Sequence, residues 1–460
     1  MAMVYHARGI CIANNREKWM HALMSFGKQK LRLGLLVAVV LCAMLSGPAL
    51  AGNLLEGWLG MQGSSPHARP YAVLDEDFYP TSVVWSPDGK YLADSGVLNA
   101  KIHIWDVAQR KMVRSIPLKY GISSTYSGLA WSPDGRYLVT GQAGGGLVVL
   151  DTRDWKQIFL HTTTNQQGDP HEFIPNNWQR MPSNMSGCLG GDIPAFSSDG
   201  KLLAFDAGGI DLKGVKTNMI CVFSTDTWQM YRELSFADVW ALGHPDYWAI
   251  GIDRLAFEPG THRLAIGMSG YFGIPRGAPK PYMDANHVIH NENPNTSRIL
   301  FWDVEGHAPD LLSPDLDQTI VAYKGAGVSL AALVFSLDGR QIATGTKTGR
   351  VLGYYSSPVT DSVHIYDVAS HALLAAPLDN TDKVGHTDAL GYIDDGKYLL
   401  VGHEGRGTGG DIDIIDTRTF KTVEVLNANG VDSLSIDPSG SRFAATSDHR
   451  LMIWDFVDQP

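Results

Sequence analysis

The sequence lacks the short motifs by which the common catalytic folds are found. It contains no zinc-protease helix motif, no Gly-x-Ser-x-Gly nucleophile elbow, no Gly-x-x-x-x-Gly-Lys phosphate loop and no Cys-x-x-Cys-His haem motif. Each of these motifs places a reactive or ligand-binding group on a defined strand-to-helix turn or helix face. We therefore expect a protein that is not an enzyme and that holds no cofactor.

Charge is missing from residues 33–55, near the amino terminus. Lys28, Lys30 and Arg32 precede this apolar run, and Ala49-Leu50-Ala51 offers a small-residue cleavage pattern at its end. Residues 1–51 therefore read as a signal peptide, and translation starting at Met24 would give it an ordinary length. We expect an exported bacterial protein, located in the periplasm or the extracellular space; an uncleaved amino-terminal membrane anchor is the alternative.

Without this segment, the chain has far fewer basic than acidic residues. Residues 1–51 hold six of the 37 Lys and Arg residues and one of the 48 Asp and Glu residues, which leaves 31 and 47 and a formal net charge of −16. Binding to a phosphate backbone or to an anionic bilayer depends on basic surface. We therefore expect neither a nucleic-acid partner nor, after cleavage, insertion into a membrane.

Cysteine is scarce, with four residues in the chain. Cleavage would discard Cys11 and Cys42 and leave Cys188 and Cys221 in an oxidising compartment. These two residues could form a disulfide that ties a loop to its neighbouring strand, or they could be two separate thiols. The sequence leaves both readings open.

The chain contains a sequence repeat in several copies. Each copy predicts a strand, a tight turn, a second strand, and a third strand that ends in an aromatic residue and aspartate. Val83 begins the first copy, Val-Val-Trp-Ser-Pro-Asp-Gly-Lys-Tyr-Leu-Ala, and Leu129 begins a close second copy. Glycine accepts positive φ without steric cost, so an Asp-Gly pair between alternating apolar runs favours a hairpin. The turns of the seven copies are at Asp88-Gly89, Asp134-Gly135, Asp199-Gly200, Pro259-Gly260, Asp338-Gly339, Asp395-Gly396 and Ser439-Gly440.

The ends of the third strands give the same count of seven. They are Trp105-Asp106, Leu150-Asp151, Phe223-Ser224, Trp302-Asp303, Tyr366-Asp367, Ile415-Asp416 and Trp454-Asp455. From Tyr71 to Asp455 the chain resembles the WD40 repeat family, although the histidine of the family's Gly-His pair is clear only at Gly385-His386. The resemblance implies an all-β, seven-bladed propeller of four-stranded antiparallel blades.

The boundaries of the blades follow from these landmarks. After a linker at residues 52–68, the propeller is expected at 69–460, with blades at about 82–117, 127–161, 193–234, 253–323, 330–378, 388–427 and 430–455. The last copy has no fourth strand, and Tyr71–Leu74 is a short alternating run directly before the first copy. We predict that residues 71–74 complete the seventh blade, which closes the ring and leaves no exposed sheet edge. The expected assembly is a monomeric ring.

Long insertions are predicted to gather on one face, because loops between the second and third strands and loops between blades leave a blade on the same side. We name this side the insertion face; its loops are Thr162–Asp192, Phe236–Ile252, Gly270–Thr296, Gly353–Asp361 and Glu404–Gly410. Loops on a rigid scaffold commonly carry function. The predicted binding residues on this face are aromatic residues and histidines: Trp178, Trp240, Trp248, Tyr271, Phe272, Tyr282, His287, His290, Tyr354 and Tyr355.

Two classes of function fit such a face. The first is a platform that binds a protein or peptide partner, which is what the resemblance to WD40 proteins implies. The alternative is a propeller enzyme, or a binder of a small ligand, carbohydrate or metal, that uses the channel mouth on the same face. His287 and His290 could join His171 at a metal, but spacing fixes no third ligand, so no metal site is predicted.

Overall fold

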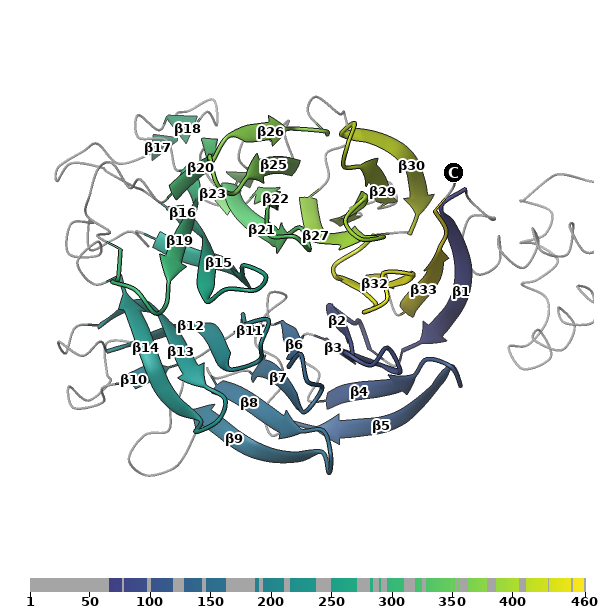
Figure 1. The fold of residues 1–460 in the computed structure, drawn as a ribbon, viewed down its shortest axis with the longest axis horizontal. Coiled ribbons are helices and arrows are strands. Elements are labelled where there is room, and N and C mark those ends of the chain that lie inside the picture. Colours follow the sequence, from purple (N-terminus) through teal and green to yellow (C-terminus); the bar gives the residue numbers. More distant parts are fainter. Residues whose placement is uncertain are drawn as a thin grey trace, which may run out of the picture. The chain divides into compact units, whose positions relative to one another are not determined.

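The computed structural model of the chain shows seven antiparallel sheets arranged as blades around a common centre (Figure 1). It describes residues 66–458 except for 77, 97–100, 119–127, 143–145, 163–186, 190–192, 211–215, 237–249, 271–281, 284–288, 291–295, 310–318, 325–327, 349, 352–353, 356–362, 379–385, 405–410, 429 and 448–449. The regular elements of this part are all strands. The predicted all-β, seven-bladed propeller is confirmed. A helix long and apolar enough to cross a membrane does not occur among these residues.

The first four blades each run outwards from the centre in chain order. Blade 1 contains β2 (Ser82–Trp85), β3 (Tyr91–Ser95), β4 (Lys101–Asp106) and β5 (Lys111–Pro117), and blade 2 contains β6 (Leu129–Trp131), β7 (Tyr137–Gln142), β8 (Gly146–Asp151) and β9 (Lys156–Thr162). Blade 3 contains β11 (Ala195–Phe196), β12 (Leu202–Ile210), β13 (Lys216–Ser224) and β14 (Gln229–Ser235), with β10 (Gly187–Leu189) also paired to β12. Blade 4 contains β15 (Ile250–Phe257), β16 (Arg263–Gly270), β19 (Thr296–Asp303) and β20 (Thr319–Lys324).

The last three blades follow the same plan, and two short hairpins stand beside the blades. Blade 5 contains β21 (Val328–Phe335), β22 (Gln341–Thr348), β25 (Val363–Asp367) and β26 (Leu373–Ala375). Blade 6 contains β27 (His386–Ile393), β28 (Tyr398–Glu404), β29 (Asp411–Asp416) and β30 (Lys421–Asn427). Blade 7 contains β31 (Leu434–Ile436), β32 (Arg442–Ser447), β33 (Arg450–Phe456) and β1 (Ala68–Asp75). The hairpins are β17 (Tyr282–Met283) with β18 (Ile289–His290), and β23 (Arg350–Val351) with β24 (Tyr354–Tyr355).

The ring is closed by β1, as the sequence predicts. This strand pairs antiparallel with β33, with Ala72 opposite Ile453 and Leu74 opposite Leu451. It is longer than the predicted run at residues 71–74, since it begins at Ala68. The Arg442 guanidinium lies 3.9 Å from the centre of the Tyr71 ring and adds a cation–π contact between the two ends of the chain. The amino-terminal strand therefore supplies the outer edge of the carboxyl-terminal blade.

Hydrogen bonds join the innermost strands of neighbouring blades. Ser82 Oγ accepts from the Leu129 backbone N–H at 3.1 Å, and Ser433 Oγ accepts from the Val83 N–H at 3.2 Å. In the same way an Asp253 carboxylate oxygen accepts from the Leu330 N–H at 3.0 Å. These bonds satisfy backbone groups that a short inner strand would otherwise bury without partners.

Apolar layers between neighbouring blades form the core. Alternation along β3 and β4 sends Leu92 and Trp105 into the layer between blades 7 and 1, and Ala93 and Ile104 into the layer between blades 1 and 2. Asp94 and His103 share a face with the first pair, because each lies two residues from one of its members. Two charge-bearing side chains therefore point into an apolar layer.

A serine and an aspartate build the tight turn of the repeat. In blade 1 the Ser86 hydroxyl donates to Asp88 Oδ1 at 2.7 Å and accepts from the Tyr91 N–H at 2.9 Å, and Gly89 has φ +70°. The same bonds recur around Ser132, Ser197 and Ser336. We name the side of the ring that carries these turns the turn face; the insertion face is predicted on the opposite side.

A second recurring device is a bulky residue with positive φ, four positions after the end of the third strand. Trp155 (φ 60°), Trp228 (φ 53°) and Phe420 (φ 56°) are examples, and the N–H of each bonds the carbonyl four residues earlier. Trp228 reaches the neighbouring blade, where its ring meets the Tyr137 ring at 5.0 Å. Left-handed conformations are costly for such residues, so their recurrence indicates a packing role.

Candidate functional site: an aromatic groove and a buried carboxylate cluster

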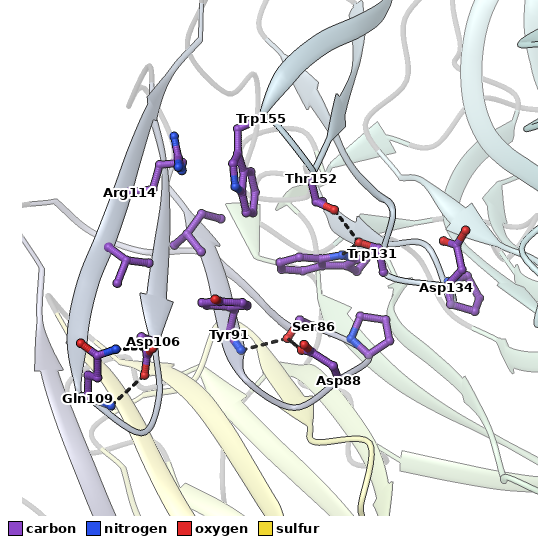
Figure 2. A pocket seen from close by; sticks show the side chains of 15 residues that line it. Ser86, Asp88, Tyr91, Asp106, Gln109, Arg114, Trp131, Asp134, Thr152 and Trp155 are labelled. Atoms are coloured by element: carbon purple, nitrogen blue, oxygen red, sulfur yellow. Dashed lines mark hydrogen bonds between the residues drawn. The ribbon is translucent and has the colours of Figure 1, made fainter.

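A groove of about 590 Å³ opens between blades 1 and 2 on the turn face (Figure 2). It lies between the Ser-Pro-Asp-Gly turns of the two blades and is closed at its outer end by the turns that follow Asp106 and Asp151. The groove exists because two neighbouring blades carry the same turn in the same place, with the space between the turns left open. Its walls come from both blades, so no single repeat contains the site.

Aromatic rings form much of the groove wall. The Trp131 and Trp155 rings meet edge to face, with 6.1 Å between their centroids, and Tyr91 lies beside Trp131 in Figure 2. The Trp131 Nε1–H donates to the Gly135 carbonyl oxygen at 2.9 Å, which fixes the plane of the indole. The Arg114 guanidinium lies 5.6 Å from the Trp155 ring. The groove thus combines the three residue types that most often dominate the binding free energy of protein interfaces.

The border of the groove is acidic. Asp88, Asp106 and Asp134 line it together with Arg114, and Lys90 Nζ lies 3.0 Å from Asp88 Oδ2. Desolvation works to raise the pKa of Asp88, but hydrogen bonds from the Ser86 hydroxyl and the Lys90 backbone outweigh it and lower that pKa below its usual value. Asp88 is therefore ionised at neutral pH. A second hollow, of about 700 Å³, lies between blades 7 and 1, and Pro87 and Asp88 line both hollows.

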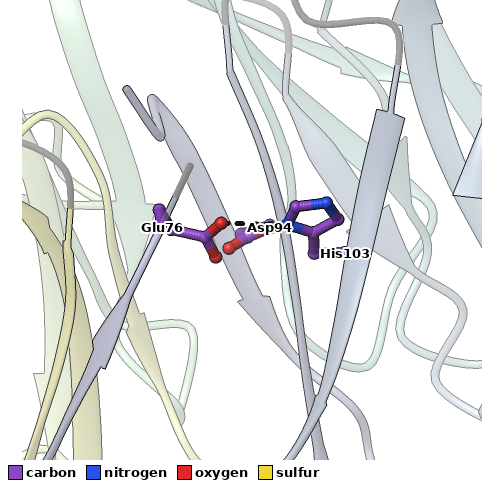
Figure 3. Close-up of side chains that lie close together, drawn as sticks. All are labelled: Glu76, Asp94 and His103. Atoms are coloured by element: carbon purple, nitrogen blue, oxygen red, sulfur yellow. Dashed lines mark hydrogen bonds and ion pairs between the residues drawn. The ribbon is translucent and has the colours of Figure 1, made fainter. Parts of the chain in front are cut away.

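A second candidate site is buried between blades 7 and 1. Glu76, Asp94 and His103 each offer one nitrogen or oxygen atom, and these atoms all lie within 4.8 Å of one another (Figure 3). His103 Nδ1 lies 2.9 Å from Glu76 Oε2. The side chains of His103 and Glu76 are 3% and 1% exposed, and Asp94 is fully buried. This group is called the blade 1 cluster below.

The hydrogen bonds of the blade 1 cluster are incomplete. Asp94 Oδ2 accepts from Trp105 Nε1–H at 3.2 Å, but Asp94 Oδ1 and Glu76 Oε1 are buried and have no hydrogen-bond partner. Desolvation raises the pKa of Asp94 well above its usual range, and the carboxyl group of Glu76 raises it further. An unpartnered buried carboxylate oxygen is costly, and this cluster has two.

Among the described strands, no other blade has two ionisable side chains at this pair of positions. The register places the pair Asp94 and His103 opposite each other, and the equivalent pairs are Thr140 with Val148, Phe205 with Cys221, Ile266 with Leu300, Thr344 with His364, Val401 with Asp413 and Ala445 with Met452. Blade 6 comes nearest in chemistry, since His403 Nε2 lies 2.8 Å from Asp413 Oδ2 and its other ring nitrogen lies 3.4 Å from the Thr387 hydroxyl.

The residues that the sequence predicts for binding lie mostly outside the described part of the chain. Trp178, Trp240, Trp248, Tyr271, Phe272 and His287 are all in undescribed ranges. The backbone alone is described for Tyr282 and His290, which pair with each other in the β17–β18 hairpin, and for Tyr354 and Tyr355 in β24. Their assignment to a binding face stays a prediction, and so does the signal peptide at residues 1–51.

The structure describes the side chain of one of the two cysteines of the predicted disulfide. Cys221, in β13, is disulfide-bonded and fully buried. Cys188 lies in β10, and its side chain is outside the described residues. The pairing of Cys188 with Cys221 stays a prediction.

Two family models match parts of the chain. The model described as "WD domain, G-beta repeat" matches residues 420–455, and the model described as "Eukaryotic translation initiation factor eIF2A" matches residues 76–144. No curated protein matches the chain. The first match and the seven four-stranded blades together support a WD40 propeller. Neither match supports the expectation of a bacterial, exported protein, since the second model is named for a eukaryotic factor.

The sequence did contain a signal for the blade 1 cluster. Asp94 occupies an inward position of a strand at which the other six blades carry Thr, Phe, Ile, Val or Ala, so a carboxylate there is out of pattern. Glu76 lies in the segment between β1 and the first repeat, where the repeat pattern says nothing. The groove had no such signal, because it depends on how two blades stand side by side.

Proposed function

We propose that the chain is a protein-interaction platform and that the groove between blades 1 and 2 binds a basic segment of a partner protein. WD40 propellers generally mediate protein–protein interactions. The observation that carries the proposal is the wall of Tyr91, Trp131 and Trp155 at an acidic border. A lysine or arginine side chain gains from both features, since aromatic faces attract cations and carboxylates pair with them.

The overall charge of the chain favours the same class of partner. The formal net charge is −11 for the full sequence, and it becomes more negative if residues 1–51 are removed. Complementary charge steers encounter and increases association rates at low ionic strength. The model named for translation initiation factor eIF2A matches residues 76–144, which include blade 1 and the first two strands of blade 2.

The insertion face is proposed as a second contact surface. Its support is the sequence, which predicts that five long loops rich in aromatic residues leave the propeller on that side. The alternative function, a propeller enzyme or a binder of a small ligand, carbohydrate or metal at the channel mouth, rests on the same loops. The two faces can be tested separately because the groove lies on the turn face.

The test is quantitative capture of a partner by the full chain and by three variants. Trp155→Asn removes the indole from the groove, and asparagine tolerates the positive φ of this position. Phe420→Asn is the matched control, since Phe420 occupies the equivalent turn of blade 6 and does not line the groove. In the third variant a short Gly-Ser hairpin replaces Gly270–Thr296.

The proposal predicts a partner whose binding weakens at least about tenfold in Trp155→Asn, weakens with added salt, and is unchanged in Phe420→Asn. A peptide from the partner that contains its basic segment should compete, and its Lys/Arg→Ala version should not. Binding that survives Trp155→Asn but is lost in the loop variant would assign recognition to the insertion face and overturn the groove proposal.

Export of the chain is proposed on sequence grounds alone. Processing after Ala51 predicts a mature protein that begins at Gly52, and mass spectrometry of the protein isolated from its native host tests this directly. Peptide mapping of the same sample without reduction should show Cys188 joined to Cys221. An intact residue such as Arg32 in the mature protein would contradict cleavage.

A further inference from the structure

We propose that Glu76, Asp94 and His103 bind a zinc ion that fastens the closing segment of the ring to blade 1. Nothing in the repeat pattern requires these three side chains, and the inference does not depend on the partner-binding function. It rests on the donor set, on the two unpaired oxygens, on burial and on charge.

The donor set suits zinc. One imidazole nitrogen and two carboxylate oxygens lie within 4.8 Å of one another, and they come from three separate places in the fold. Imidazole with carboxylates is a ligand combination that zinc accepts, whereas calcium and magnesium prefer sites made of oxygen alone. Three protein ligands leave further coordination to water.

Each carboxylate has an oxygen available as a ligand. Asp94 Oδ2 is held by Trp105 Nε1–H at 3.2 Å, while Asp94 Oδ1 is buried without a hydrogen-bond partner. Glu76 Oε1 is likewise buried and unpartnered. A hydrogen bond to the outer oxygen of a ligating carboxylate is the usual way in which a protein orients a metal ligand. Trp105 supplies that bond here.

Charge leads to the same conclusion. Two carboxylates and one imidazole are enclosed, with side-chain exposures of 1% for Glu76 and 3% for His103 and none for Asp94. If both carboxyl groups are ionised, an imidazolium supplies only one of the two positive charges needed, and uncompensated buried charge is strongly unfavourable. A divalent cation with a neutral imidazole makes the group neutral.

The position of the site explains what the ion would do. Glu76 follows directly on β1, which belongs to blade 7, whereas Asp94 and His103 lie on β3 and β4 of blade 1. Phe78 packs against the His103 ring at 5.0 Å, on the way to β2. A zinc ion would therefore tie together the two blades that meet where the ring is closed.

The test uses the full chain, loaded with Zn²⁺, dialysed and analysed for metal content and thermal unfolding. We expect about one zinc ion held tightly per chain, and a midpoint of unfolding that falls by several degrees when a chelator removes it. Glu76→Gln and His103→Gln should lose both the retained zinc and the chelator effect. His403→Gln is the matched control, since His403 is a buried histidine beside a carboxylate in blade 6, and it should keep both.

Several outcomes would overturn the proposal. They are wild-type protein without retained zinc after loading, a midpoint of unfolding that is the same with Zn²⁺ and with chelator, and a Glu76→Gln variant that retains as much zinc as the wild type. The last result would place any bound zinc elsewhere, for example on loop histidines. Because Glu76→Gln removes a buried negative charge, we expect it to fold even if His103→Gln does not.

Discussion

Blade 1 and blade 6 both bury a histidine against a carboxylate, but the two sites are built differently. In blade 6 His403 lies 2.8 Å from Asp413, and the Thr387 hydroxyl lies 3.4 Å from the other ring nitrogen. In blade 1 His103 lies 2.9 Å from Glu76, and Asp94 adds a second carboxylate to the same space. One bound proton makes the blade 6 pair neutral, whereas the blade 1 cluster needs two bound protons or a divalent cation.

The difference shows how little is needed to turn a packing position into a charged site. Blade 6 draws its pair from two neighbouring strands, β28 and β29, as any blade could. Blade 1 takes Glu76 from the segment between β1 and β2, which joins blade 7 to blade 1. The repeat supplies the strands, and the closing segment supplies the excess charge. Four predictions test this comparison, from the largest expected effect to the smallest.

Removal of the closing segment should have the largest effect. A chain that begins at Phe78 lacks β1 and Glu76, so β33 becomes an exposed edge and blade 7 loses its outer strand. We expect the loss of cooperative unfolding, at a cost comparable to the whole stability of a domain, about 5 kcal/mol or more. Circular dichroism during thermal unfolding measures this. A chain that begins at Pro66 is the control, and equal midpoints for the two chains would refute the role of β1.

Neutralising one carboxylate should have opposite effects in the two blades. Asp413→Asn removes the carboxylate that lies 2.8 Å from His403 Nε2, and we expect it to destabilise the protein by about 2 kcal/mol. Glu76→Gln removes one of two buried carboxylates, so with a chelator present we expect it to stabilise the protein by about 1 kcal/mol. Chemical denaturation followed by tryptophan fluorescence compares the two variants. The account fails if both variants change the free energy of unfolding in the same direction.

The indole that holds Asp94 gives a smaller effect. Trp105→Phe keeps the ring in the apolar layer and removes the Nε1–H that donates to Asp94 Oδ2. We expect a loss of about 1–2 kcal/mol, together with weaker zinc retention because the ligand is less well oriented. Ile415 occupies the equivalent position in blade 6 and donates nothing, so Ile415→Val provides a packing control. Unchanged zinc retention in Trp105→Phe would argue against the orienting role.

Asp253, on the inner strand of blade 4, should give the smallest effect. Desolvation raises the pKa of Asp253 to about 6, against hydrogen bonds from the Leu330 N–H and Ser269. An unfolded aspartate has a pKa of about 3.9, so the folded chain binds more protons between these values and stability falls as pH rises from about 4 to about 6. The loss then stays constant at higher pH.

Asp253→Asn should remove that dependence, since the amide oxygen can still accept from the Leu330 N–H. Asp253 is half-buried, so we expect a gain of about 1 kcal/mol relative to the wild type as pH rises from 4 to 7. Denaturation midpoints at a series of pH values measure it. A constant difference between the variant and the wild type over this range would contradict the raised pKa.

Most of the fold could be predicted from the sequence because the repeat carries it locally. The Ser-Pro-Asp-Gly turn contains its own hydrogen bonds, as the Ser86 and Asp88 contacts show. Each copy of this turn in the sequence therefore predicts the same hairpin. The closing strand could be predicted from a missing fourth strand and a spare alternating run at residues 71–74. The left-handed turn residues such as Trp155 and Phe420 had no local signal, because bulky residues are unfavourable there.

The sites could be predicted far less well, for a physical reason in each case. Glu76 and Asp94 are 18 residues apart and meet only because one blade closes against another. The groove of Trp131 and Trp155 depends on the spacing between two blades. Both sites arise from contacts between repeats, and a pattern read within one repeat does not contain them.

The most direct test of the zinc site is anomalous diffraction from crystals of the full chain grown with Zn²⁺ and measured on either side of the zinc absorption edge. The account predicts one strong anomalous peak among Glu76, Asp94 and His103 and none between His403 and Asp413. Clear density for the three side chains with no anomalous peak between them, in zinc-loaded crystals, would contradict it.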